Sequence, residues 1–158
     1  MILYLIAVGR VRDTGLRAVC EDYARRARRT VRLEIHEVAE AGRRGGTVAA
    51  ARRLETERLI ATAPEAAFRV ALTRRGEAPS SLEFAERLRT WRENARDVAL
   101  LLGGAFGLDP ALVDQCDERL ALSALTLPHD VARLVLLEQL YRACTILRGE
   151  PYHKAERS

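Results

Sequence analysis

Hydrophobic and polar positions follow two spacings along the chain, and together they predict strands separated by helices. An apolar run at 2–8, closed by Gly9, is typical of a strand buried on both faces. Residues 31–38 alternate apolar and polar side chains, which predicts a strand with one face in water. Apolar runs at 68–72, 98–102 and 120–127 predict three more strands.

Helical spacing fills the intervals between these runs. Helices are predicted over 16–29, 47–63, 80–94 and 129–148. The helix at 80–94 has a clear start signal, because Ser80 with Glu83 forms a capping-box pattern. Asp109, which precedes a proline, predicts a further helix start. Strands that alternate with helices predict an α/β fold, with a mostly parallel sheet flanked by helices, within a single domain of residues 1–158.

Two segments near the expected carboxyl ends of strands have the composition of a ligand site, since parallel sheets bind ligands there. Segment 100–110 leaves a strand through three glycines, which permit close backbone approach to a ligand. Segment 120–129 is small and apolar up to Pro128, and such a loop exposes peptide groups beside an apolar wall, as adenine requires. The alternative interpretations are a tight strand-to-helix turn and a plain core strand.

Charge changes this picture only moderately. The formal net charge is +4, and residues 1–79 hold 16 arginines against 10 acidic residues, whereas residues 80–158 hold 10 basic and 12 acidic residues. Such an excess can attract phosphate backbones, although arginines are also ordinary surface residues in a chain whose only lysine is Lys154. The clustered arginines are Arg25, Arg26, Arg28, Arg29, Arg43, Arg44, Arg52, Arg53, Arg74 and Arg75.

Cysteines and histidines exclude several classes of site. Cys20, Cys116 and Cys144 are odd in number and far apart, so neither a disulfide framework nor a zinc site is indicated, and we expect a reducing cytoplasm. No apolar run could span a membrane, the amino terminus lacks the charges of a signal peptide, and the histidines lack metal-ligand spacing. We therefore expect neither a membrane nor a metal among the partners.

Four spaced motifs carry a resemblance to a known family. With residues 7–9 and the Glu21 and Tyr23 pair, they extend over the whole chain, which resembles the ribosomal RNA large subunit methyltransferase H family of the SPOUT superfamily. The motifs are Gly103-Gly104 with Gly107-Leu108, Leu122 to His129, Tyr141-Arg142-Ala143, and Pro151-Tyr152-His153.

The resemblance implies a homodimer with a deep trefoil knot near the carboxyl end, which binds S-adenosylmethionine and methylates N3 of a pseudouridine in 23S ribosomal RNA of the assembled 70S ribosome. It implies that His129, Arg142, Tyr152 and His153 border the target base, where the catalytic residues are expected. The implied cofactor-binding residues are Leu72, Thr73, Gly103, Gly104, Ser123, Ala124, Leu125, Thr126, Leu127 and Pro128.

Four positions depart from the common pattern of that family: Thr73, Ala105, Phe106 and Lys154. They predict altered affinity, and three of them, Thr73, Ala105 and Phe106, support a second hypothesis, a non-catalytic RNA- or ribosome-binding module with a degenerate cofactor site. A third hypothesis, a nucleotide-sensing α/β regulator, depends on the glycine turn alone. The absence of a phosphate-binding lysine there weighs against it.

Overall fold

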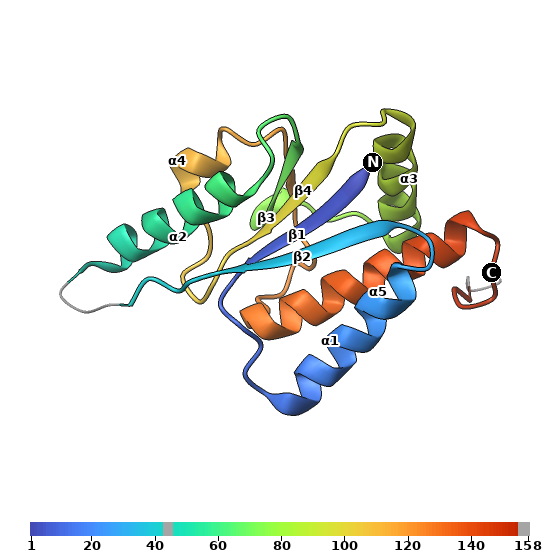
Figure 1. Cartoon of the computed structure of the whole chain (residues 1–158), viewed down its shortest axis with the longest axis horizontal. Helices are drawn as coiled ribbons and strands as arrows, with labels where there is room; N and C mark the ends of the chain where they lie inside the picture. Colours follow the sequence, from blue (N-terminus) through green and yellow to red (C-terminus); the bar gives the residue numbers. More distant parts are fainter. Residues whose placement is uncertain (43–45, 155–158) are drawn as a thin grey trace.

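Strands and helices alternate along the whole described chain (Figure 1). The computed structural model describes residues 1–42 and 46–154, so Arg43 and Arg44, two of the clustered arginines, lie outside the described residues. The elements are β1 (Ile2–Val8), α1 (Thr14–Ala27), β2 (Arg32–Val38), α2 (Val48–Thr62), β3 (Phe68–Glu77), α3 (Ser81–Glu93), β4 (Val98–Leu102), α4 (Pro110–Val113), β5 (Glu118–Leu120) and α5 (His129–Leu147).

The strands form a single sheet in the order β2-β1-β4-β3-β5, and every neighbouring pair is parallel. Leu3 pairs with Leu33 on one side and with Val98 on the other, which places β1 within the sheet. The predicted fold class, an α/β fold with a parallel sheet and flanking helices, is confirmed.

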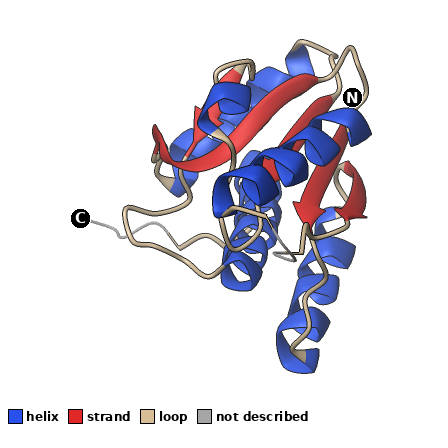
Figure 2. Cartoon of the chain, turned by 90° about the vertical axis from the view of Figure 1, so that its left-hand side faces the viewer, coloured by secondary structure: helices blue, strands red, loops and turns tan. Residues whose placement is uncertain are grey.

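Helices cover both faces of the sheet, and successive side chains of β1 explain why (Figure 2). Leu3 and Leu5 belong to the core that packs beneath α1, α3 and α5, whereas Ile6 and Val8 belong to a smaller core with Leu59 of α2. Side chains of a strand point alternately to opposite faces, so a continuous apolar run is needed where both faces are covered. The prediction of a doubly buried strand at 2–8 is therefore confirmed.

The predicted helix starts are also present. Ser80 accepts a hydrogen bond from the Glu83 N–H, while the Glu83 carboxylate accepts one from the Ser80 N–H, which completes the capping box of α3. Asp109 caps the short helix α4 at Pro110. These caps satisfy peptide N–H groups that have no partner inside the helix.

The predicted strand at 120–127 is wrong. Strand β5 ends at Leu120, and residues 121–128 form an irregular loop. Its last ladder-like bond is the Ala121 N–H to the Glu77 carbonyl, after which the Ser123 hydroxyl accepts from the Leu125 N–H and turns the chain away. Leu125 is 74% exposed, whereas Leu122 and Leu127 are partly buried against the core, so the loop does not bury its apolar residues in the regular way of a strand.

Strand β3 is longer than predicted and crosses β5. Its regular pairing with β5 stops at Leu72, and pairing resumes only where Glu77 meets Leu120. At this crossing Gly76 lies against the Leu120 backbone, and a β-carbon on Gly76 would stand 2.5 Å from the Leu120 nitrogen. Among the described residues, we find no helix with the length and apolar character needed to cross a membrane.

Candidate functional site

A cleft of about 930 Å³ opens at the carboxyl ends of β3, β4 and β5. The two segments that the sequence singled out, the glycine turn after β4 and the loop before α5, both line it. Apolar walls come from Leu72, Leu102, Leu122 and Leu127, and His129 lies at the start of α5. The predicted position of a ligand site is therefore occupied by a cleft of suitable size.

The glycine turn is held in a tight shape. Gly104 and Gly107 form an isolated antiparallel bridge, and Gly107 has a φ of +71°, a conformation that favours glycine. A β-carbon on Gly103 would stand 2.7 Å from the Gly107 carbonyl carbon, so a larger residue cannot occupy position 103 without moving the turn. Asp109 anchors the end of the turn to α2, because its N–H donates to the Thr56 hydroxyl at 2.9 Å.

The loop at 121–128 faces this turn across the cleft. Its N–H groups at Ala121 and Leu125 are bonded to Glu77 and Ser123, and the Pro128 carbonyl accepts from Ala132 in α5. Among the described residues we find no hydrogen-bond partner for the other peptide groups of the loop, which leaves them available to a ligand. Peptide donors and acceptors beside apolar walls match the needs of a purine ring.

Positive charge gathers at the cleft. Arg52, Arg74, Arg75 and Arg119 line it against the single carboxylate of Asp114, which pairs with Arg119 at 2.6 Å. Arg74 donates to the Thr126 hydroxyl at 2.8 Å and so connects the segment after β3 to the loop before α5. Guanidinium groups in this arrangement can bind carboxylate or phosphate oxygens.

Nearly all the residues expected at a cofactor line the cleft, as do three of the positions that depart from the family pattern, Thr73, Ala105 and Phe106. Ala124, which is exposed, is not part of the lining. The predicted cofactor-site residues in the lining are Leu72, Thr73, Gly103, Gly104, Ser123, Leu125, Thr126, Leu127 and Pro128.

Three of the four residues expected to be catalytic lie elsewhere, in a cluster at the far end of α5. Arg142 approaches the His153 ring nitrogen Nδ1 at 3.4 Å, and its guanidinium lies 4.8 Å from the centre of the Tyr152 ring. His129, the fourth residue, begins the same helix, 13 residues before Arg142. With a rise of about 1.5 Å per residue, His129 and Arg142 are about 20 Å apart.

The carboxylate of Glu138 holds this cluster together. Its Oε1 accepts from the Tyr152 hydroxyl at 3.0 Å and from the Arg142 Nε at 3.0 Å. The hydrogen bond to Glu138 raises the pKa of Arg142, and burial, together with the hydrogen bond to the Glu138 carboxylate, raises the pKa of Tyr152. Sequence reasoning missed Glu138 as a site residue, although its spacing of four from Arg142 on one helix was a usable signal.

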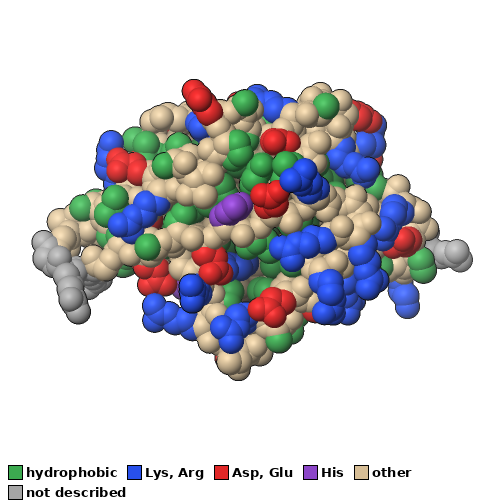
Figure 3. Space-filling view, viewed as in Figure 1, with side chains coloured by type: hydrophobic (Ala, Val, Ile, Leu, Met, Phe, Trp, Pro, Cys, Tyr) green, Lys and Arg blue, Asp and Glu red, His purple; other side chains and the backbone are tan. Residues whose placement is uncertain are grey.

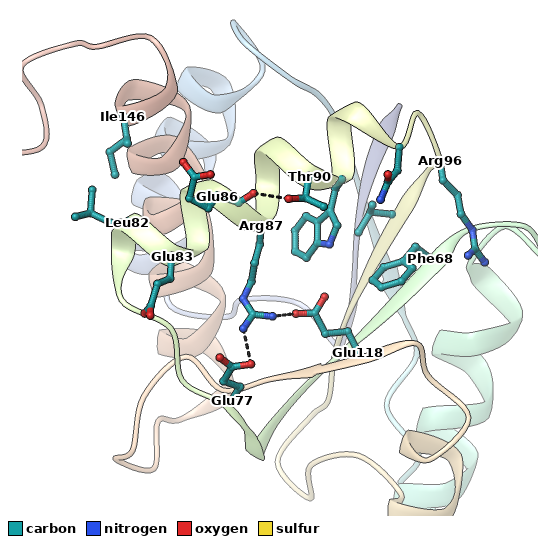
Figure 4. Close-up of a pocket in the computed structure, with 13 residues that line it drawn as sticks. Phe68, Glu77, Leu82, Glu83, Glu86, Arg87, Thr90, Arg96, Glu118 and Ile146 are labelled. Carbon is teal, nitrogen blue, oxygen red and sulfur yellow. Dashed lines mark hydrogen bonds and ion pairs between the residues drawn. The ribbon is translucent and has the colours of Figure 1, made fainter.

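A larger hollow of about 1110 Å³ lies beside α3, toward the amino-terminal ends of β3 and β4 (Figure 4). Arg87 reaches across it to Glu118 and Glu77, and Phe68 and Trp91 form apolar walls. Four glutamates and two arginines line this hollow, so its charge suits an anion poorly. We assign the ligand site to the smaller cleft, because it lies at the carboxyl ends of the strands and is lined by positive charge.

Outside the cleft, the arginine excess is largely paired. On the face shown in Figure 3, basic side chains are interspersed with acidic ones. Arg25 and Arg26 both pair with Asp22, and Arg53 pairs with Glu57. Of the clustered arginines, Arg52, Arg74 and Arg75 line the cleft, where Arg119 joins them.

Comparison with known proteins agrees with this geometry. A family model described as "Predicted SPOUT methyltransferase" matches residues 1–153. Proteins named "Ribosomal RNA large subunit methyltransferase H" are 51% identical in Anaeromyxobacter sp. strain Fw109-5, 49% in Anaeromyxobacter sp. strain K and 46% in Gemmatimonas aurantiaca. Each alignment extends over 98% of this chain and 100% of the relative.

The chain has a parallel α/β sheet with a cleft at its carboxyl edge, and this family model matches nearly the whole chain. Together these features define a methyltransferase. The chain belongs to the SPOUT methyltransferase family. The resemblance inferred from the spaced motifs is thereby confirmed.

Proposed function

We propose that this chain transfers the methyl group of S-adenosylmethionine to N3 of a pseudouridine in 23S ribosomal RNA of the assembled 70S ribosome. The observation that carries the proposal is the convergence of the glycine turn at 103–107 and the loop at 121–128 on one cleft, in a chain of this family. Relatives that match the full chain at up to 51% identity are named as ribosomal RNA methyltransferases, which supports RNA as the substrate.

The residues of the cleft fit this cofactor. Leu72, Leu102 and Leu122 provide apolar contact for an adenine ring, and the unpaired peptide groups of the loop can bind its nitrogens. Arg52 and Arg75 are available for carboxylate or phosphate groups. When bound, S-adenosylmethionine supplies an electrophilic methyl group on a sulfonium.

The protein's contribution is mainly alignment of the nucleophile, which is worth roughly 7 to 11 kcal/mol where the geometry is close to that of attack. The imino proton of the base must leave, and His129 at the edge of the cleft is the candidate acceptor in the same protomer. Arg142, Tyr152 and His153, about 20 Å along α5 by helix rise, would border the same base from a second copy of the chain.

A homodimer would bring these two groups together. Val131 and Val135 of α5 are partly exposed apolar side chains, and Val19 of α1 is 42% exposed. Such side chains are suited to self-association. The crossing of 73–77 with 120–128 would belong to the deep trefoil knot that the resemblance implies.

The test is methyl transfer to purified 70S ribosomes from cells that lack this protein, with labelled S-adenosylmethionine and mapping of the modified nucleotide. We expect one labelled pseudouridine in 23S ribosomal RNA, and calorimetry should detect cofactor binding. Absence of cofactor binding would favour the non-catalytic RNA-binding module, whereas cofactor binding without transfer to the ribosome would contradict the proposed substrate. A dilution series of the protein should show that methyl transfer falls as the dimer dissociates. A monomer that still transfers methyl groups would contradict the shared site.

A further inference from the structure

One carboxylate organises the whole carboxyl-terminal cluster. Glu138 lies on α5, is only 18% exposed, and receives hydrogen bonds from two residues expected to act on RNA, Arg142 and Tyr152. Arg142 is bound through both its Nε and its Nη2, a two-point contact that fixes the plane of the guanidinium. Tyr152 belongs to the segment after the helix, so Glu138 also attaches this tail to α5.

We propose that Glu138 is a positioning residue, which sets Arg142 and Tyr152 in one arrangement for the RNA base. This inference rests on the proposed function, because it assumes that these two side chains meet the substrate. Glu138 itself would not touch the base, since its Oε1 is already used by Arg142 and Tyr152.

This arrangement determines which tyrosine hydroxyl donates and which accepts. Tyr152 donates its only proton to Glu138, so the Tyr23 hydroxyl, 3.2 Å from that of Tyr152, must donate to the Tyr152 oxygen. Tyr141 packs edge-on against Tyr152, with ring centres 4.7 Å apart. Helix α1, helix α5 and the tail are thus joined through one phenol, whose position depends on the Glu138 acceptor.

The other oxygen of Glu138 is part of a second chain of hydrogen bonds. Gln139 donates to Oε2 at 2.6 Å, and the Ser81 hydroxyl at the start of α3 donates to Gln139 at 2.7 Å. In Glu138→Gln the new amide can donate to the carbonyl oxygen of a flipped Gln139, whose amide group can then donate to Ser81. The substitution therefore removes the negative charge of residue 138, while each of these hydrogen bonds can still form.

Glu138→Gln should lower the single-turnover rate of methyl transfer to 70S ribosomes at least tenfold, because Arg142 loses its charged partner. The affinity for S-adenosylmethionine should stay within twofold, since Glu138 does not line the cleft. Glu86→Gln is the matched control: Glu86 also pairs with an arginine on its own helix, α3, and its side-chain hydrogen bonds are to Arg89 rather than to Arg142 or Tyr152. It should leave the rate unchanged.

A spectroscopic measurement separates this idea from the proposed function. The negative charge of Glu138 contributes to raising the pKa of Tyr152, so alkaline titration of tyrosine absorbance should show one tyrosine ionising at lower pH in Glu138→Gln. This readout needs no RNA.

A shifted titration with an unchanged transfer rate would overturn the positioning role and leave the proposed function intact. An unshifted titration would show that Glu138 does not hold Tyr152, which also overturns the proposal. Absence of transfer by the unaltered protein would instead contradict the proposed function. Glu138→Asp, which keeps the charge, should recover more activity than Glu138→Gln, and equal losses in the two variants would indicate a purely steric role.

Discussion

Gly76 and Leu120 lie so close that a β-carbon on Gly76 would stand 2.5 Å from the Leu120 nitrogen and 2.6 Å from its carbonyl carbon. The contact is between two backbones at the crossing of β3 and β5, so no side-chain rotation can relieve it. Gly76→Ala should therefore lower the free energy of unfolding by about 3 kcal/mol, at the upper end of the usual cost of overpacking. Urea unfolding followed by fluorescence of Trp91, the only tryptophan, measures this.

Gly42→Ala is the control for this substitution, because a β-carbon at Gly42 would have no atom within 4 Å. Its free energy of unfolding should change by less than about 1 kcal/mol. If both variants unfold at the same urea concentration, the crossing is not as tight as the geometry indicates.

A second prediction concerns the buried guanidinium of Arg133, whose side chain is 5% exposed. It donates to Glu37 Oε1 at 2.5 Å and to the Gly9 carbonyl at 2.7 Å, and so attaches α5 to the ends of β1 and β2. Glu37→Ala leaves this cation without a charged partner. Because Glu37 is partly exposed, we expect a loss of about 2 kcal/mol, less than the roughly 3–5 kcal/mol typical of a fully buried pair.

The double variant Glu37→Ala with Arg133→Met removes both charges and should recover at least half of that loss, as measured by chemical denaturation. Glu57→Ala, which removes the exposed partner of Arg53, should change stability by less than about 1 kcal/mol. Additive effects in the double variant would mean that Arg133 is solvated rather than held by Glu37.

Local pattern was sufficient for most of the fold. The apolar runs of β1 and β4 and the cap residues Ser80 and Asp109 predict their elements because each signal is contained in a few neighbouring residues. Strand β5 was predicted too late in the chain, since the leucines at 122–127 have the pattern of a strand although they line a cleft. A pattern of apolar and polar residues does not distinguish an apolar residue that lines a ligand site from one that packs within a strand.

The cleft was predictable from local pattern, whereas the bond from Glu138 to Tyr152 was not. Strand ends followed by glycine and small residues predict where a parallel sheet binds its ligand, and both segments line the cleft. Glu138, by contrast, is hydrogen-bonded to Tyr152, which is 14 residues away, and Tyr152 contacts Tyr23 across 129 residues. Contacts at such separations arise from packing, which a local pattern does not contain.

The third prediction concerns thiol chemistry. Burial raises the pKa of the Cys144 thiol from about 9 to about 11. At pH 8 only about one such thiol in a thousand is ionised, so a thiol-disulfide reagent should modify half-buried Cys116 well before Cys144. Mass spectrometry of the partly modified protein identifies the site, and early labelling of Cys144 would show that α5 opens readily.

The same raised pKa gives stability a defined pH dependence. The folded state holds the Cys144 proton more tightly than the unfolded state does, so this contribution is complete below pH 9 and is lost as the pH rises to about 11. The loss is at most about 2.7 kcal/mol, from two pKa units. Cys144→Ala should reduce the difference in stability measured between pH 8 and pH 10.

The last prediction separates ligand binding from folding at Leu125, which lines the cleft while remaining 74% exposed. A leucine in water contributes little to a core, so Leu125→Asp should leave the free energy of unfolding within about 0.5 kcal/mol of the unaltered protein. If the adenosyl group covers Leu125, the aspartate would have to lose its water on binding, and calorimetry should show at least a tenfold weaker affinity for S-adenosylmethionine. Leu82→Asp makes the same change at a leucine that is 52% exposed and lines the other hollow, so it should bind the cofactor normally. Equal affinities in both variants would remove Leu125 from the cofactor site, whereas equal losses would point to a general effect of added negative charge.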